Sequence, residues 1–135
     1  METTYCVNFG HPLSGKDIIQ LKGILGGEVV EIHVPFSLEF ESEIPTRTQV
    51  RNIVDVAERA VRHLGSSLTG AALLVVQLPG VTEGAALVLA EMVGLSGELP
   101  RMVSRRRRAD GTYGVADREA IIDLNKVRLD ARGRR

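Results

Sequence analysis

The chain has 135 residues, and its 17 basic and 17 acidic side chains leave no net charge. This length supports one compact core without metal or disulfide staples. The single cysteine, Cys6, excludes a disulfide framework within the chain, and we expect it to be a buried structural thiol. No apolar run reaches the roughly 18 residues of a membrane span, and the N-terminus lacks the basic start of a signal peptide. We therefore expect one cytoplasmic domain over residues 1–135.

Charge is unevenly distributed along the chain. Residues 1–100 carry 6 basic and 12 acidic side chains, whereas residues 101–135 carry 11 basic and 5 acidic ones. This asymmetry favours an anionic partner for the C-terminal quarter, although a solvated basic tail explains it equally well.

The first strand-helix unit is predicted near the N-terminus. A strand near residues 4–9 precedes a helix over 15–25. Ser14 and Asp17 have the spacing of a capping box at the start of this helix, and Gly26 ends it.

The second unit follows directly. A strand over residues 28–36 leads through the loop 37–45 into a strongly amphipathic helix over 46–64. Thr46 and Gln49 have the spacing of a second capping box.

The third unit is the most apolar. Its strand, residues 71–78, is apolar on both faces, as a central parallel strand covered by helices must be. Its helix, residues 82–93, is apolar almost all round, so we expect part of its surface to contact another subunit.

The C-terminal quarter is predicted to contain a β-hairpin. Residues 101–107 lead to the turn 109–112 and return through 113–116, because an Asp-Gly pair between two short runs favours an antiparallel hairpin. Residues 119–124 form a further strand or the lead into a last helix over 125–132. Three repeated strand-helix units predict an α/β fold with a mostly parallel central sheet.

Ligands of such sheets bind beyond the carboxyl ends of the strands. With the strands in the order two, one, three, the crevice is lined by Asn8–Ser14 and Leu78–Gly84. Each loop ends at a helix N-terminus, where free N–H groups favour a phosphate, and Gly10 and Gly80 allow close approach. The candidate ligand-binding residues in these loops are Asn8, Phe9, Gly10, His11, Pro12, Ser14, Pro79, Gly80, Val81 and Thr82.

The first of these loops nearly has the spacing of a P-loop. Gly10, Gly15 and Lys16 occupy the required positions between strand and helix. Asp17 stands where a hydroxyl should bind magnesium, however, and Pro12 removes one N–H from the cradle. A triphosphatase is therefore disfavoured, although the loop retains the features needed to hold a phosphate without a metal.

His11 is the one histidine in a predicted crevice loop, and its imidazole is suited to proton transfer near neutral pH. A purely local role in the turn explains it equally well. His33 on a strand and His63 near a helix C-terminus have sufficient structural explanations. No metal-ligand spacing is present, so we expect no metal and no cofactor.

The run Arg105-Arg106-Arg107-Arg108 is the strongest charge feature. Alternate residues of a strand point to opposite faces, so Arg105 and Arg107 can address one ligand, and their guanidinium groups match a phosphate. The alternative is an edge strand whose charges prevent aggregation.

Several short motifs occur in a characteristic order along almost the whole chain. They are Asn8-Phe9-Gly10-His11-Pro12-Leu13, Leu78-Pro79-Gly80 leading into residues 85–91, Gly97-Glu98-Leu99-Pro100, and Ile121-Ile122-Asp123-Leu124 with Val127-Arg128. In these motifs the chain resembles the small proteins of type III CRISPR systems called the Csx family numbered fifteen, which are grouped with the ring nucleases. Asp117-Arg118 and the dense arginine run depart from the pattern.

The resemblance implies a Rossmann-like three-layer sandwich that binds cyclic oligoadenylate, most readily the cyclic tetra-adenylate ring, in antiviral defence. A ring with two-fold symmetry suits a homodimer. If the ring is cleaved, a metal-independent route has the ribose 2′-hydroxyl attack the adjacent phosphodiester, giving a 2′,3′-cyclic phosphate. The catalytic residues are then His11, as proton donor or acceptor, and Arg105, which stabilises charge on the phosphoryl oxygens. Asn8 and Ser14 fix the ring, and Arg105 or Arg107 covers it. If the ring is only sequestered, the same residues bind it.

The sequence does not separate cleavage from sequestration. An alternative of a different class is a nucleic-acid-binding accessory protein that uses the arginine-rich hairpin, and a third is a structural subunit without a ligand.

Overall fold

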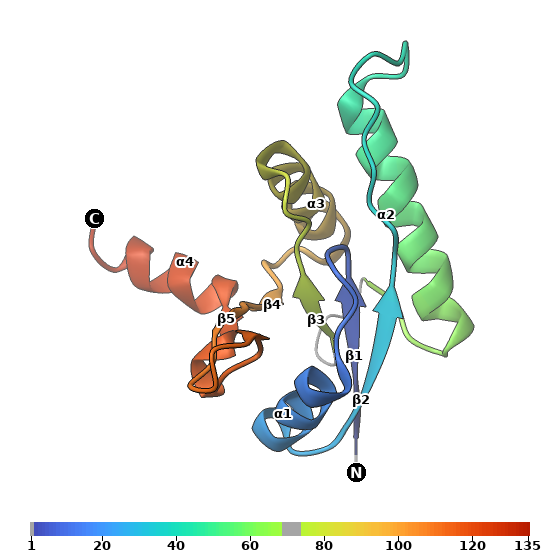
Figure 1. Cartoon of the computed structure of the whole chain (residues 1–135). Coiled ribbons are helices and arrows are strands. Elements are labelled where there is room, and N and C mark those ends of the chain that lie inside the picture. The colour runs from blue at the N-terminus through green and yellow to red at the C-terminus, as the bar shows by residue number, and fades with distance from the viewer. Residues whose placement is uncertain (1, 69–73) are drawn as a thin grey trace.

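The computed structural model describes residues 2–68 and 74–135 and shows an α/β protein with a five-stranded, mostly parallel sheet (Figure 1). The strand order is β2-β1-β3-β4-β7, in which β1, β2, β3 and β4 are parallel and β7 is antiparallel to β4. The strands are β1 (Thr3–Asn8), β2 (Glu28–His33), β3 (Leu74–Gln77), β4 (Arg101–Val103) and β7 (Ile121–Asp123). The order two, one, three, on which the predicted crevice depended, is the order observed for the first three strands.

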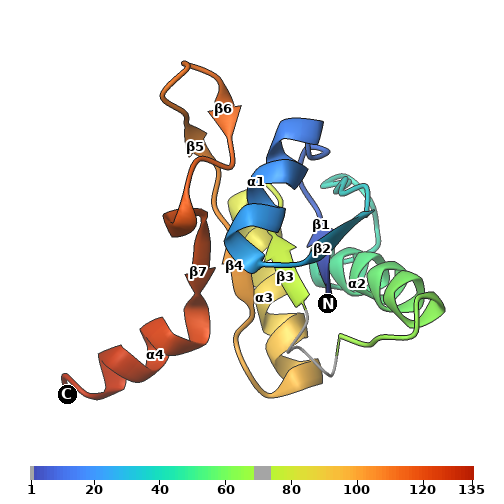
Figure 2. The ribbon, with the colours of Figure 1, turned by 90° about the horizontal axis from the view of Figure 1, so that it is seen from below.

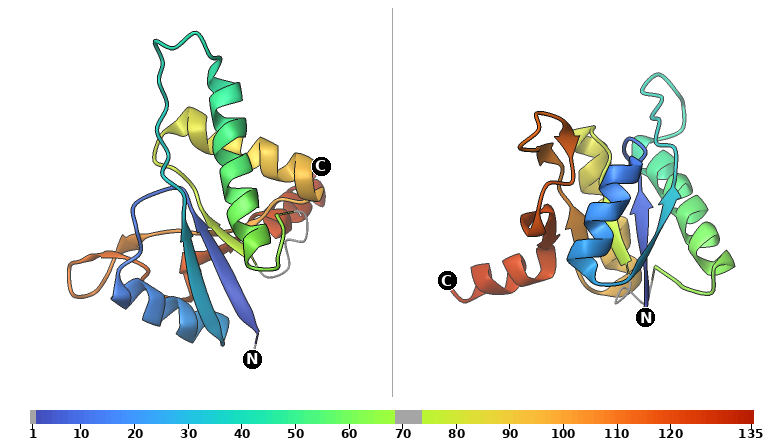
Figure 3. Two further views of the ribbon diagram at one scale, coloured as in Figure 1. Left: turned by 90° about the vertical axis from the view of Figure 1, so that its right-hand side faces the viewer. Right: turned by 60° about the horizontal axis from the view of Figure 1, so that its bottom comes forward.

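Helices α1 (Gly15–Leu25), α2 (Thr46–His63) and α3 (Thr82–Ser96) cover the two faces of this sheet. A short 3₁₀ turn, η2 (Arg118–Ala120), and a fourth helix, α4 (Leu124–Arg132), follow near the C-terminus. Helices α2 and α3 lie on one side and α1 on the other (Figure 3). Among the described residues, no helix is both long and apolar enough to cross a membrane.

The two faces of the sheet bury separate apolar clusters. Along β1, Val7 packs toward α2 and α3, whereas Cys6 packs toward α1. Both side chains are fully buried, because a central parallel strand is covered on each face. The expected burial of Cys6 is confirmed, and this burial raises the pKa of its thiol to about 12.

Helix α1 has the predicted boundaries and the predicted cap. The Ser14 hydroxyl accepts a hydrogen bond from the Asp17 N–H, and the Asp17 carboxylate accepts one from the Ser14 N–H. Gly26 closes the helix at φ 77°, a conformation that glycine adopts without strain.

Helix α2 begins at Thr46 as predicted, but the capping box predicted for it is wrong. Pro45 occupies the cap position, and no side chain caps this end. The Gln49 amide instead bonds the backbone of Glu39 and Ile44. Gln49 therefore holds the preceding loop against the helix.

Two other boundaries differ from the prediction by more than one residue, and a third is not described. Strand β2 ends at His33 instead of residue 36, because Pro35 lacks the N–H that a further ladder bond needs. Helix α3 continues to Ser96, where Gly97 ends it in the left-handed conformation. Residues 71–73, predicted as the start of the third strand, lie outside the described residues.

The C-terminal quarter divides differently from the prediction. Residues 101–103 form β4 of the main sheet, and only β5 (Arg106–Arg107) pairs antiparallel with β6 (Tyr113–Gly114). We call this β5–β6 pair with its turn, residues 105–115, the arginine hairpin. Beyond β7, α4 has no buried residue and projects from the body (Figure 2).

Candidate functional site

Three polar side chains mark the carboxyl ends of three neighbouring strands. Asn8 is the last residue of β1, and the ladders pair it with His33 at the end of β2 and with Gln77 at the end of β3. Because all three strands run in the same direction, these side chains gather at one edge of the sheet.

Asn8 is fully buried and organises the loop that follows β1. Its Nδ2 donates to the His11 carbonyl and to Glu31 Oε2, both at 2.7 Å, and its Oδ1 accepts from the Gly10 N–H at 2.8 Å. Glu31 Oε2 also accepts from the Leu13 N–H at 2.8 Å. The Asn8 amide thus shapes the loop from beneath.

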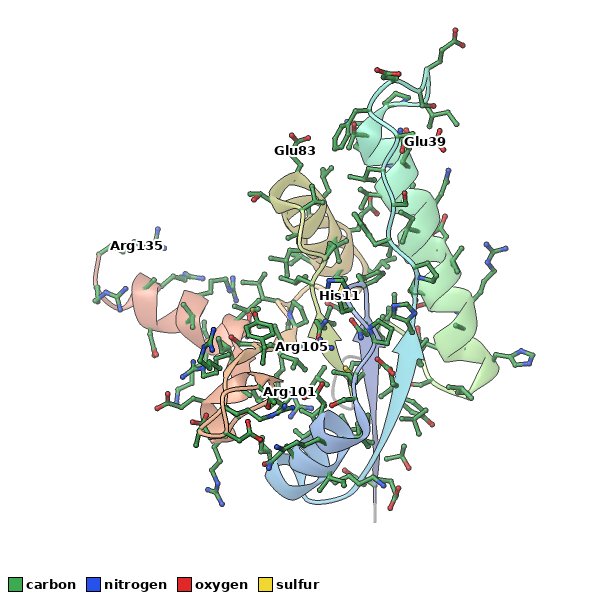
Figure 4. The ribbon with its side chains drawn as sticks, viewed as in Figure 1. His11, Glu39, Glu83, Arg101, Arg105 and Arg135 are labelled. Atoms are coloured by element: carbon green, nitrogen blue, oxygen red, sulfur yellow. The ribbon has the colours of Figure 1, made fainter. Side chains whose placement is uncertain are left out.

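The His11 carbonyl accepts hydrogen bonds from three side chains. Besides Asn8, it accepts from Arg105 Nη2 at 2.6 Å and from Gln77 Nε2 at 3.3 Å. His33 Nε2 lies 2.9 Å from the Gly10 carbonyl. Residues from β1, β2, β3 and the arginine hairpin therefore hold one loop, and Figure 4 shows His11 and Arg105 close together above the strand ends.

A cavity of about 400 Å³ opens between this loop, the start of α3 and the arginine hairpin. His11 and Gly80 are exposed at it, and Tyr113 of β6 is 69% exposed. Its lining is formed by Gly10, His11, Gln77, Leu78, Pro79, Gly80, Ala85, Met102, Val103, Ser104, Arg105 and Tyr113.

Two buried polar atoms in this lining have no hydrogen-bond partner among the described residues, namely Arg105 Nε and Gln77 Oε1. Buried polar groups of folded proteins are usually paired, so an unpaired donor and an unpaired acceptor in one cavity point to a polar ligand.

Helix α3 contributes Ala85 of its first turn to the lining of the same cavity. Val81 occupies the cap position, and no side chain caps the helix. The unpaired N–H groups of the first turn give this end partial positive charge. Gly84 packs under Phe36, where an added Cβ would lie 2.6 Å from the ring. This contact fixes the start of α3 relative to the loop after β2.

A second hollow of about 390 Å³ lies on the other side of His11 and Pro79. Phe9 and Phe36 meet edge to face in its wall, with ring centroids 6.3 Å apart. Phe9 is only 2% exposed and belongs to the core. Pro12, His33 and Val81 complete the more accessible part of the lining.

The arginine hairpin is fastened to the N-terminus of α1 by two ion pairs. Arg108 Nη2 contacts Asp17 Oδ1 in a pair that is almost fully buried, and Lys16 pairs with Asp110 at the surface. Burial of Asp17 favours its neutral form, but hydrogen bonds from Val115 and Ser14 prevail and hold the pKa of Asp17 below its usual value. Lys16 and Asp17, the last residues of the P-loop-like spacing, thus both contact the hairpin.

The structure brings together only part of the predicted set. The predicted residues that line one or both hollows are Gly10, His11, Pro12, Pro79, Gly80, Val81 and Arg105. Asn8 and Phe9 lie beneath the loop, and Ser14 caps α1. Thr82 begins α3 at an exposed position, and Arg107 is exposed on β5 outside the lining of both hollows.

Several residues of this region were missed in the sequence, among them Gln77, Glu31, Ser104 and Tyr113. Gln77 and Glu31 are polar residues in otherwise apolar strands, and this pattern is visible in the sequence. Their place near the end of β1 follows only once the strand order is known. Ser104 and Tyr113 carried no signal, because their place at the cavity depends on how the arginine hairpin folds back.

No cluster of three or more metal-ligating side chains occurs within residues 2–68 and 74–135. In comparisons with protein-family models, curated proteins and solved structures, no match to this chain was found.

Proposed function

We propose that this protein binds cyclic tetra-adenylate at the cavity between the β1–α1 loop, the start of α3 and the arginine hairpin. It would act as a cytoplasmic, Rossmann-like three-layer sandwich in type III CRISPR antiviral signalling, where it lowers the level of this second messenger. The observation that carries the proposal is Arg105, which lines this cavity and whose Nε is buried without a hydrogen-bond partner among the described residues. A guanidinium group favours an anionic phosphate.

The size of the cavity supports a shared ring. A volume of about 400 Å³ falls in the range of small-ligand pockets and suits one or two nucleotide units rather than four. A two-fold homodimer would offer two such cavities to one ring. Helix α3 supplies an apolar surface for the contact, because Ala86 and Ala90 are exposed and Leu95 is 41% exposed.

A cleavage step would need no metal. The ribose 2′-oxygen forms a bond to the adjacent phosphorus as the bond from phosphorus to the 5′-oxygen breaks, leaving a 2′,3′-cyclic phosphate and a 5′-hydroxyl. The His11 imidazole is exposed at the cavity and is suited to remove the 2′ proton or to protonate the departing oxygen. Arg105 would stabilise charge on the phosphoryl oxygens. If the 2′-hydroxyl is held out of line, the same residues sequester the ring intact.

Labelled cyclic tetra-adenylate incubated with the purified protein in chelator tests the proposal. Linear products establish cleavage, and retained intact ring establishes sequestration. His11→Ala is compared with His63→Ala, whose side chain lies at the end of α2 away from the cavity. A protein that neither retains nor cuts the ring refutes the proposal.

A second candidate is a nucleic-acid-binding accessory protein. Arg106 and Arg107 are exposed on β5, and the exposed helix α4 adds Lys126, Arg128 and Arg132. Binding of long RNA or DNA should weaken steeply with salt according to the number of phosphate contacts, whereas ring binding should depend less on salt and strictly on the ring.

A further inference from the structure

We infer that Asp17 and Arg108 form a positioning pair that holds Arg105 and Tyr113 at the cavity. This inference rests on the proposed function for the identity of the ligand, whereas the geometry of the pair does not depend on it. Neither residue lines the cavity.

The pair is almost fully withdrawn from solvent, with side-chain exposures of 4% for Asp17 and 9% for Arg108. Asp17 Oδ1 also accepts from the Val115 N–H at 3.0 Å. Asp17 therefore bonds both sides of the arginine hairpin from the first turn of α1.

Arg108 fastens the hairpin to itself as well. Its Nε donates to the Val115 carbonyl at 2.9 Å, and its Nη1 donates to Thr112 Oγ1 at 2.9 Å. One guanidinium thus joins the turn, the returning strand and α1, a task that the planar fork of arginine suits.

Gly114 shows how closely these groups are packed. A Cβ at this position would collide with both Arg108 Nη2 and Asp17 Oδ1. The hairpin backbone must pass directly against the ion pair, and only glycine leaves the space.

The consequence for the cavity follows from chain connectivity. Arg105 is three residues before Arg108, and Tyr113 pairs across the hairpin with Arg107. Docking the turn and the β6 end on α1 therefore sets where Arg105 and Tyr113 lie. The exposed ion pair of Lys16 with Asp110 adds little to the docking of the hairpin on α1, because surface ion pairs contribute little to stability.

Arg108→Met in the full chain tests the pair, with Arg106→Met as the matched control. Arg106 is a neighbouring arginine whose ion pair with Glu119 is exposed, and it lies outside the cavity lining. Asp17 keeps its hydrogen bonds from Ser14 and Val115 in Arg108→Met, so we expect this variant to fold. Arg108→Lys serves as the conservative variant that retains the charge.

The first readout is solvent exchange of the Arg105 Nε–H group by NMR, assigned through its loss in Arg105→Lys. This group is buried, so we expect slow exchange in the parent protein. Arg108→Met should accelerate it about tenfold more than it accelerates amide exchange in β1 and β3, and Arg108→Lys should restore part of the protection. Unchanged exchange, or an equal effect of Arg106→Met, overturns the inference.

The second readout is affinity for cyclic tetra-adenylate. Arg108→Met should weaken binding about tenfold, comparable with losing one charge-assisted hydrogen bond, while Arg106→Met should not. Faster Arg105 exchange with unchanged affinity overturns the functional part of the inference. If the parent protein does not bind the ring, the proposed function fails, and the exchange measurement still decides whether the pair positions Arg105.

Discussion

Replacing Asp17 by alanine should destabilise the fold strongly, because Asp17 is the buried partner of Arg108. The change leaves the Arg108 guanidinium buried, at 9% exposure, without its counter-charge. Removing one partner of a buried ion pair costs about 3–5 kcal/mol. Loss of the acceptor for the Ser14 and Val115 N–H groups adds to this cost.

A cost of this size is a large fraction of the stability of an ordinary domain, which is about 5–15 kcal/mol. Urea unfolding followed by far-ultraviolet circular dichroism measures the change in the free energy of unfolding. The double variant Asp17→Ala with Arg108→Met should be more stable than Asp17→Ala alone, because no uncompensated charge then remains buried. An Asp17→Ala variant within about 1 kcal/mol of the parent, or strictly additive losses in the double variant, would refute this reasoning.

Four further outcomes are expected. On acidification, the unfolding free energy should stay constant down to about pH 5 and then fall as the pH drops through the lowered native pKa values of Asp17 and Glu58. Asp17→Asn should make the unfolding free energy depend less on pH. Gly84→Ala should lower stability by about 1–3 kcal/mol by crowding Phe36, whereas Gly23→Ala in the exposed interior of α1, with open space around it, should raise stability slightly; thermal unfolding compares them. Cys6 should react with a thiol reagent only as fast as the fold opens, since its thiol is fully buried and its pKa is raised to about 12; a rapid stoichiometric reaction of the native protein would contradict this. Arg105→Gln should weaken ring binding about 10- to 150-fold by calorimetry, and unchanged affinity would remove Arg105 from the site.

The elements with strong local signals were predictable from the sequence. Helix α1 has its capping box, its glycine stop and its apolar periodicity within a dozen residues, and its boundaries agree with the prediction. The repeated order of apolar strand and helix likewise indicated a mostly parallel sheet, which the structure has. Local propensity and hydrophobic pattern agree in these segments, so the local sequence is sufficient to define these elements.

The rest depends on contacts between residues far apart in the chain. Thr46 and Gln49 have capping-box spacing, yet Gln49 bonds the loop at Glu39 and Ile44, which competes with the cap. The candidate site shows the same limit. Asn8 has a polar side chain in the right loop, but its bonds to Glu31 and His11 turn it inward. Such hydrogen-bond partners can be predicted only when it is known which segments are neighbours in the fold.

The arginine run shows how one motif divides among different tasks. Arg105 reaches the cavity, Arg106 pairs with exposed Glu119, and Arg108 is buried against Asp17. Simple strand alternation does not predict this division, because β5 contains only Arg106–Arg107 and the chain turns at Arg108.

The most direct test of the account is an NMR titration of the uniformly ¹⁵N-labelled protein with cyclic tetra-adenylate. We expect saturable shifts of the Gly10, His11 and Gly80 amides and of the Arg105 Nε–H group, which surround the cavity. Linear tetra-adenylate should produce smaller shifts at the same concentration. The absence of shifts, or shifts confined to α4 and the exposed face of β5, would contradict the account.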